Sequence, residues 1–285
     1  MSLMSTTPLS GLLRARRVYS NFGEEEIIRR LVAALPPARR PETAVDLGAG
    51  DGVRHSNTHA LFNAGWRGLA VEADARRAYR LARTYRNHPH VSFCRCRVTP
   101  HNVVALLNAY EIEPEFGVLS LDIDSYDYWV LDALLGAFRP RLVVTEINEK
   151  IPPPIRFVVN YDPGFRLQHH FYGHSIQSLA ELSARHGYAL VELEYNNAFL
   201  APLEHAPAPP LAPAEAYRRG YLERPDRRAK FRLNEDMEVL HTLTPAAAVE
   251  FLNRFYARHA GRYHIGLADA PAPVAPAECE LVGKQ

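Results

Sequence analysis

The sequence predicts an α/β protein built on a mostly parallel β-sheet with helices on both faces. Short apolar runs alternate with stretches of helical periodicity between residues 43 and 146, and this alternation is typical of a doubly wound sheet. Two further apolar runs, joined by a tight turn at residues 195–197, predict an antiparallel hairpin that closes the sheet. We therefore expect a seven-stranded sheet followed by a small helical C-terminal appendage.

Five apolar runs are expected to form parallel strands, with helices between them. The strands are expected at residues 43–47, 68–72, 91–96, 117–122 and 142–146, and the helices at 56–64, 74–86, 101–110 and 127–138. A helix from Ser175 then leads into the hairpin strands at 188–194 and 198–202. Residues 149–174 are expected to be a long connection without regular structure, which is uncommon unless the segment is functional.

The flanking segments contain helix start and stop signals. Before the first strand, Asn21 is expected as an N-cap with Glu24 as its capping-box partner, and the prolines at 36–37 end that helix. Near the other end, Thr244 and Pro245 predict the start of a last helix. The expected divisions are a leader and cap helix over 1–36, a ligand-binding domain over 37–203, a linker and helical appendage over 204–267, and a disordered tail over 268–285.

Composition excludes several functional classes. The chain has 285 residues, 47% of them hydrophobic, and its formal net charge is +1, so electrostatics gives no reason to expect nucleic acid or an anionic membrane as a partner. No apolar run approaches the roughly 20 residues that span a bilayer. The 3 cysteines cannot form a disulfide framework, which favours a reduced, cytoplasmic setting.

The most informative motif is a glycine-rich turn after the first strand, followed by an acid after the second. The turn reads Gly48-Ala49-Gly50-Asp51-Gly52, and Glu72 ends the next strand. In a βαβ unit, such glycines let the backbone approach a nucleoside ligand, and the carboxylate accepts hydrogen bonds from ribose hydroxyls. Because Asp51 would repel a pyrophosphate and attract a cationic amino-acid group, the pattern favours S-adenosylmethionine over a dinucleotide.

With these features, residues 20–203 resemble the Rossmann-like fold of class I S-adenosylmethionine-dependent methyltransferases. Four short segments resemble the FkbM-type branch, in which many members are O-methyltransferases: Tyr19–Glu24, Asp46–Gly52, Ser56–Thr58 and Gly65–Gly68. The resemblance implies that Asp46, Gly48 and Gly50 approach the methionine part of the cofactor. It implies that Glu72 binds the ribose and that Arg97 and Val98 border the adenine. It also implies that Asp122 lies near the sulfonium and the incoming nucleophile.

Polar residues at two neighbouring strand ends suggest how an acceptor is activated. Asp122 and Glu146, with Asn148, offer oxygen ligands that suit Mg²⁺, which would lower the pKa of a bound hydroxyl. The alternative is that Asp122 contacts the cofactor while Asp124 and Asp127 cap the following helix. His170 and His174 are candidate general bases, since imidazole titrates near neutrality; the alternative is that both are surface loop residues.

We therefore expect methyl transfer from S-adenosylmethionine to a small-molecule acceptor, with oxygen favoured over nitrogen as the nucleophile. Asp122 and Glu146 would hold or activate the acceptor. Three alternatives remain open: a different reaction on S-adenosylmethionine, a nicotinamide-dependent dehydrogenase, and a non-catalytic nucleoside-binding protein of the same fold. The sequence leaves open whether the chain forms a homodimer and whether the C-terminal helices form a lid or a dimer surface.

Overall fold

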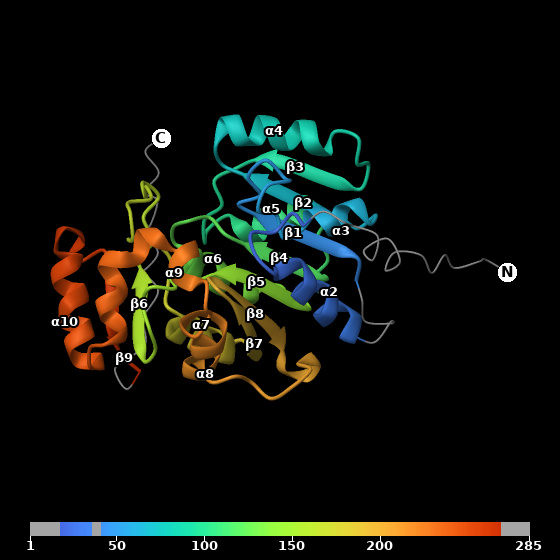
Figure 1. Cartoon of the computed structure of the whole chain (residues 1–285). Coiled ribbons are helices and arrows are strands. Elements are labelled where there is room, and N and C mark those ends of the chain that lie inside the picture. The colour runs from blue at the N-terminus through green and yellow to red at the C-terminus, as the bar shows by residue number, and fades with distance from the viewer. Residues whose placement is uncertain (1–17, 36–40, 269–285) are drawn as a thin grey trace.

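The computed structural model describes residues 18–35 and 41–268, and its centre is a seven-stranded sheet of order β3-β2-β1-β4-β5-β8-β7 (Figure 1). The strands are β1 (Thr43–Leu47), β2 (Arg67–Glu72), β3 (Val91–Arg95), β4 (Val118–Leu121), β5 (Leu142–Glu146), β7 (Tyr188–Glu194) and β8 (Asn197–Pro202). The first five pair in parallel, and β8 runs antiparallel to both β5 and β7. The predicted fold class is confirmed.

The strand order reverses between β1 and β4. The chain builds outward from β1 through β2 to β3 and then returns to place β4 on the other side of β1. At this point the amide of Asp122 donates to the carbonyl of Leu47 at 2.9 Å, so the carboxyl ends of the two strands lie side by side. Ligands of open α/β sheets bind beyond the strand ends at such a reversal.

Helices cover both faces of the sheet. The helices of this part are α2 (Glu24–Ala34), α3 (His59–Asn63), α4 (Ala75–Tyr85), α5 (Val103–Ala109), α6 (Asp127–Leu135) and α7 (Ile176–Arg185). All five residues of β1 are buried, and its alternate side chains enter different cores, because successive strand residues point to opposite faces. Val45 and Leu47 pack with α5, α6 and α7, whereas Ala44 packs with α2, α3 and α4.

The start of α2 differs from the prediction. Gly23, not Asn21, is the N-cap and makes no side-chain cap, and the hydroxyl of Ser20 accepts from the first-turn amide of Glu25 at 3.3 Å. The carboxylate of Glu25 instead accepts from the upstream amides of Tyr19 and of Ser20, the latter at 3.1 Å. The prediction is wrong because the acidic side chain of Glu25 binds the backbone before the helix, and the helix begins two residues later than the capping box predicts.

Residues 149–174 contain a strand that the sequence did not predict. Strand β6 (Ile155–Val159) pairs antiparallel with β9 (Tyr263–Leu267) in a separate two-stranded sheet. Every residue of β6 except Arg156 is buried, so the strand lacks the polar–apolar alternation of a half-buried strand. Its partner strand lies about a hundred residues away in the sequence, and no local sequence pattern predicts a pairing over that distance.

The C-terminal segment packs on the same core as the sheet. It comprises the short helices η2 (Leu203–His205), α8 (Pro213–Tyr217), η3 (Arg218–Leu222), α9 (Arg227–Lys230), η4 (Arg232–His241), α10 (Pro245–Phe255) and η5 (Ala257–His259). Figure 1 shows α10 beside the β6–β9 sheet. Thr244 caps α10 as predicted, accepting from the amide of Ala247 at 3.3 Å. Tyr217, Tyr221 and Leu252 are buried in the core cluster that contains β1 residues.

Among the described residues, no helix has the length and apolar character that crossing a bilayer requires. The tail predicted to be disordered lies, from residue 269 on, outside the described residues.

Candidate functional site

Two joined cavities lie at the carboxyl ends of β1, β2 and β4. One has a volume of about 420 Å³ and the other of about 500 Å³. Both are lined by Gly48, Arg77, Asp122 and Asp124. The larger cavity extends over the glycine-rich turn, and the smaller one extends between the ends of β2 and β3 toward Tyr126. Together they form one cleft at the reversal of strand order, which is where the sequence predicted a site.

The glycines of the turn have different roles. Gly48 has a φ of +95°, and a Cβ there would lie 1.7 Å from the carbonyl oxygen of Asp122. It is therefore needed for the close approach of β1 to β4. Gly50 has a φ of +59°, lines the larger cavity, and a Cβ there would meet no heavy atom within 4 Å. Gly50 thus leaves room for a ligand beside the backbone.

Glu72 ties the turn to the end of β2. One carboxylate oxygen accepts from the amide of Gly50 at 2.9 Å, and the other accepts from the amide of Asp74 at 2.7 Å. The side chain is 6% exposed and lines the smaller cavity. Because each carboxylate oxygen has two lone pairs, both oxygens retain acceptor capacity toward a ligand in the cavity.

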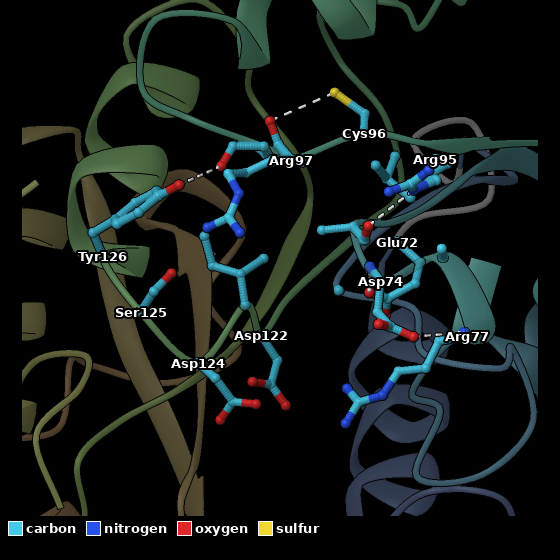
Figure 2. Close-up of a pocket in the computed structure, with 16 residues that line it drawn as sticks. Glu72, Asp74, Arg77, Arg95, Cys96, Arg97, Asp122, Asp124, Ser125 and Tyr126 are labelled. Carbon is cyan, nitrogen blue, oxygen red and sulfur yellow. Dashed lines mark hydrogen bonds between the residues drawn. The ribbon is translucent and has the colours of Figure 1, made fainter. Parts of the chain in front are cut away.

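The far wall of the smaller cavity combines apolar and cationic groups. Val98 and Tyr126 are buried there, and the hydroxyl of Tyr126 donates to the carbonyl of Val98 at 3.2 Å. Figure 2 shows Arg97 and Tyr126 on one side of the pocket and Glu72 with Asp74 on the other. Arg97 and Val98, which the resemblance implies border the adenine, both line this cavity.

The larger cavity carries charges of both signs. Its acidic residues are Asp46, Asp51, Asp122 and Asp124, and its basic residues are Arg54, Arg77 and Arg80. The amino and carboxylate groups of a free amino acid need such a mixture of partners.

Two of these acids are held by neighbouring donors. Asp46 is 5% exposed and accepts from the hydroxyl of Thr58 at 2.6 Å, and burial raises its pKa to about 6. Burial alone would raise the pKa of Asp51 as well, but the amides of Arg54 and Val53 lower it below its usual value. Asp51 is therefore a turn-stabilising carboxylate that also faces the cavity.

Three carboxylates gather at the ends of β4 and β5. Oxygen atoms of Asp122, Asp124 and Glu146 lie within 4.8 Å of one another, and Figure 2 shows Asp122 and Asp124 pointing into the cavity. Desolvation by the surrounding loops, followed by mutual repulsion, raises the pKa of Asp122 and of Glu146. Asn196 donates to Glu146 at 2.5 Å. Such a cluster holds a shared proton or a cation at neutral pH.

The neighbouring acid Asp127 has a different role from the predicted helix cap. It is the first residue of α6 and accepts from the amides of Ile123 at 2.8 Å and Ser125 at 2.9 Å. It therefore shapes the loop that carries Asp124, whose φ is +54°. The alternative in which Asp124 and Asp127 cap α6 is wrong, because no side chain caps this helix.

Asn148 lines neither cavity, and its Oδ1 is buried without a hydrogen-bond partner among the described residues. Its amide nitrogen donates to the carbonyls of His170 and Tyr172, each at 2.9 Å, and the residue has no exposed surface. The side chain therefore anchors the loop after β6 to the end of β5. The structure brings Asp122 and Glu146 together as the sequence predicted and adds Asp124 to them.

Neither candidate base lines the cleft. His170 is 4% exposed, and its Nε2 lies 3.0 Å from Asp236. His174 has no exposed surface, and neither ring nitrogen has a hydrogen-bond partner in the described part of the chain. Burial lowers the pKa of His174 to about 3. Neither residue is among those that line the two cavities.

His174 makes the protein sensitive to acid, and this can be measured. Its folded-state pKa lies below the ordinary value of 6.5, so the stability associated with the neutral ring is present above pH 6.5 and is lost as the pH falls toward 3. The loss reaches about 3 kcal/mol at pH 4. We expect His174→Leu to remove this part of the acid dependence of the unfolding free energy, measured in urea. His90→Leu, at an exposed position, should leave the dependence unchanged, and equal slopes for wild type and His174→Leu would contradict the assignment.

The sequence did not predict a buried polar network that lies beside the cleft. Lys150 donates to Glu149 at 2.9 Å and to the hydroxyl of Tyr172 at 2.8 Å, and Asn234 donates to Glu149 at 2.6 Å. Both Glu149 and Lys150 are buried. The network ties the end of β5 to the C-terminal helices. The sequence shows only adjacent opposite charges, which usually lie on a solvated surface, and the partners come from distant segments.

Comparisons with known proteins give a likeness of fold. No family model matches the chain, and no curated protein does. Among solved structures, the chain resembles CurJ carbon methyltransferase, with 10% identity and a TM-score of 0.39 over 68% of this chain and 58% of that one. It also resembles a putative O-methyltransferase from Klebsiella pneumoniae, with 16% identity and a TM-score of 0.42 over 68% and 86% of the two chains.

A third similar structure is the O-methyltransferase NcsB1 from neocarzinostatin biosynthesis, in complex with S-adenosylmethionine and a naphthoic acid. Here the identity is 15% and the TM-score 0.36, over 63% of this chain and 56% of that one. The chain thus spans little more than half of CurJ and of NcsB1. Likeness at this level does not extend to function or to individual residues.

Proposed function

We propose that the cleft binds S-adenosylmethionine and that the protein transfers its methyl group to an oxygen of a small molecule. The observation that carries the proposal is the division of the cleft into two joined cavities of different character. One offers a hydroxyl-accepting carboxylate, Glu72, beside the apolar surface of Val98. The other offers acidic and basic side chains together. A nucleoside joined to an amino acid matches both cavities, whereas a dinucleotide would bring phosphates against Asp51 and Asp122.

Each part of the cofactor has residues that suit it. Val98 and Arg97 would border the adenine, Glu72 would accept from the ribose hydroxyls, and the charged groups of the larger cavity would bind the amino-acid end. Asp122 lines both cavities and would lie beside the sulfonium between them. When bound, the cofactor supplies an electrophilic methyl group on a good leaving group, so the protein must mainly position and deprotonate the acceptor.

The carboxylate cluster is suited to take the acceptor's proton. Desolvation by burial, followed by repulsion between neighbouring carboxylates, raises the pKa of Asp122 and of Glu146, and a base is most effective when its pKa approaches the operating pH. We propose that one of these carboxylates accepts the proton of an acceptor hydroxyl. The two candidate histidines have no part in the proposal, because neither lines the cleft.

A magnesium ion is a second way to use the same cluster. Oxygen ligands from Asp122, Asp124 and Glu146 suit a hard cation, which would lower the pKa of a bound hydroxyl. If the cluster works through Mg²⁺, EDTA should abolish turnover and Mg²⁺ should restore it. If it works through a shared proton, turnover should survive EDTA unchanged. Measuring methyl transfer with and without the chelator distinguishes the two.

Calorimetry tests the binding proposal. We expect S-adenosylmethionine and S-adenosylhomocysteine each to bind with a stoichiometry of one and NAD to give no heat. Saturation by NAD without heat from S-adenosylmethionine would overturn the proposal.

Product analysis then tests the reaction. Formation of S-adenosylhomocysteine supports methyl transfer, methylthioadenosine indicates a different reaction on the same cofactor, and binding without turnover indicates a non-catalytic protein.

A further inference from the structure

Two histidines and an aspartate meet away from the cleft, between the loop after β6 and η4. Ligand atoms of His169, His170 and Asp236 lie within 4.8 Å of one another. His170 Nε2 and Asp236 Oδ1 are 3.0 Å apart, close to the roughly 3.3 Å that separates two ligand atoms of a tetrahedral zinc ion with bonds of 2.0–2.1 Å. A metal ion could therefore replace the shared proton with little movement of either side chain.

The backbone brings the two adjacent histidines to the same side of the chain. Side chains of neighbouring residues in an extended strand point in opposite directions. Here the amide of Phe171 donates to the carbonyl of Gln168 at 2.9 Å, which closes a tight turn with both histidines at its corners. His169 has a φ of +46°, in the region that favours glycine. The ring centroids are consequently 3.7 Å apart with an interplanar angle of 69°.

The position of His170 is fixed by neighbours that are themselves buried. Its carbonyl accepts from the amide nitrogen of Asn148 at 2.9 Å and from the hydroxyl of Tyr256 at 2.8 Å. Its ring also packs near Phe255. The two hydrogen bonds fix the backbone of His170, and the contact with Phe255 limits the positions of its ring. Lys150, whose charge acts on His170, is paired with Glu149 at 2.9 Å and so adds little net repulsion toward a cation.

The site is open to solvent on one side. His169 is exposed, and the side chain of Asp236 is 47% exposed. Two imidazoles with one carboxylate suit zinc and related transition metals rather than Mg²⁺, which prefers oxygen ligands. We propose that His169, His170 and Asp236 bind one divalent transition-metal ion of the zinc class, with water as a fourth ligand. The ion would join the loop after β6 to η4 and so hold the C-terminal helices in place.

Co²⁺ is a useful probe of this site, because its visible absorption reports tetrahedral nitrogen and oxygen ligands. Untagged protein, stripped with EDTA, should bind one Co²⁺ with a visible band that Zn²⁺ abolishes and excess Mg²⁺ does not. His169→Ala and Asp236→Asn should each weaken Co²⁺ binding more than about tenfold. Zn²⁺ should raise the melting temperature of the wild type and not that of either variant. Both substitutions are at exposed positions, so the fold should persist.

The pair formed by His186 and Asp132 provides a matched control. Its Nε2–Oδ1 distance is 2.7 Å, but no second histidine belongs to that pair among the described residues that could group around a metal. His186→Ala should therefore bind Co²⁺ as the wild type does. Absence of stoichiometric Co²⁺ binding by the wild type would overturn the proposal. Equal binding by wild type, His169→Ala and Asp236→Asn would overturn it as well, since the ion would then lie elsewhere.

Discussion

Replacing Gly48 with alanine is expected to lower the free energy of unfolding by roughly 3–5 kcal/mol. The added Cβ would lie 1.7 Å from the carbonyl oxygen of Asp122, so β1 and β4 would have to separate at the point where the two cavities meet. The φ of +95° at Gly48 adds backbone strain for any residue with a side chain. Urea denaturation followed by circular dichroism measures the loss.

Gly50→Ala is the matched control in the same turn. It also has a positive φ, but its Cβ would meet no heavy atom within 4 Å. We expect a cost of about 1 kcal/mol, which is the strain of a left-handed alanine. Similar losses for both variants would show that the contact with Asp122 does not determine the role of Gly48.

Replacing Glu72 with glutamine is expected to weaken S-adenosylmethionine binding by about a hundredfold or more. The carboxylate would lose charge-assisted hydrogen bonds to ribose hydroxyls, each contributing about 1.5–3 kcal/mol. The glutamine NH₂ would also face the amide of Gly50 or of Asp74, where the carboxylate now accepts at 2.9 and 2.7 Å. Calorimetry with S-adenosylmethionine measures the affinity, and urea denaturation without ligand reports any structural loss separately.

Glu113→Gln is the control for Glu72→Gln. Glu113 lies near the opposite end of β2, where its exposed carboxylate accepts from Arg67 at 2.9 Å. It should bind S-adenosylmethionine with wild-type affinity, since exposed ion pairs contribute little and the residue does not line the cleft. Unchanged affinity in Glu72→Gln would remove the ribose role from Glu72.

The central sheet was predictable because its signals are local. Buried parallel strands are short continuous apolar runs, and β1 and β5 begin and end where the sequence placed them. Ser175 accepts from the amide of Ser178 and caps α7 as predicted. The β6–β9 sheet was not predictable, because β9 contains Gly266 and a polar His264 and because its partner lies far away in the sequence.

The cleft was predictable for a similar reason. Parallel strands end on one edge of the sheet, so acids at or just past their ends, such as Asp46, Glu72 and Asp122, lie along that edge. The positions of His170 and His174 were not predictable. Both lie within the long connection, and their burial depends on Tyr256, Asn148 and other groups from separate segments. The network around Glu149 was not predictable either, because its partner Asn234 comes from a distant segment.

A crystal structure of the protein with S-adenosylhomocysteine tests the assignment of the cleft most directly. The ribose hydroxyls should lie within hydrogen-bond distance of the Glu72 carboxylate. The adenine should lie beside Val98, and the amino-acid end should occupy the larger cavity with Asp46 and Asp51. A ligand bound elsewhere, or one whose ribose points away from Glu72, would contradict the assignment.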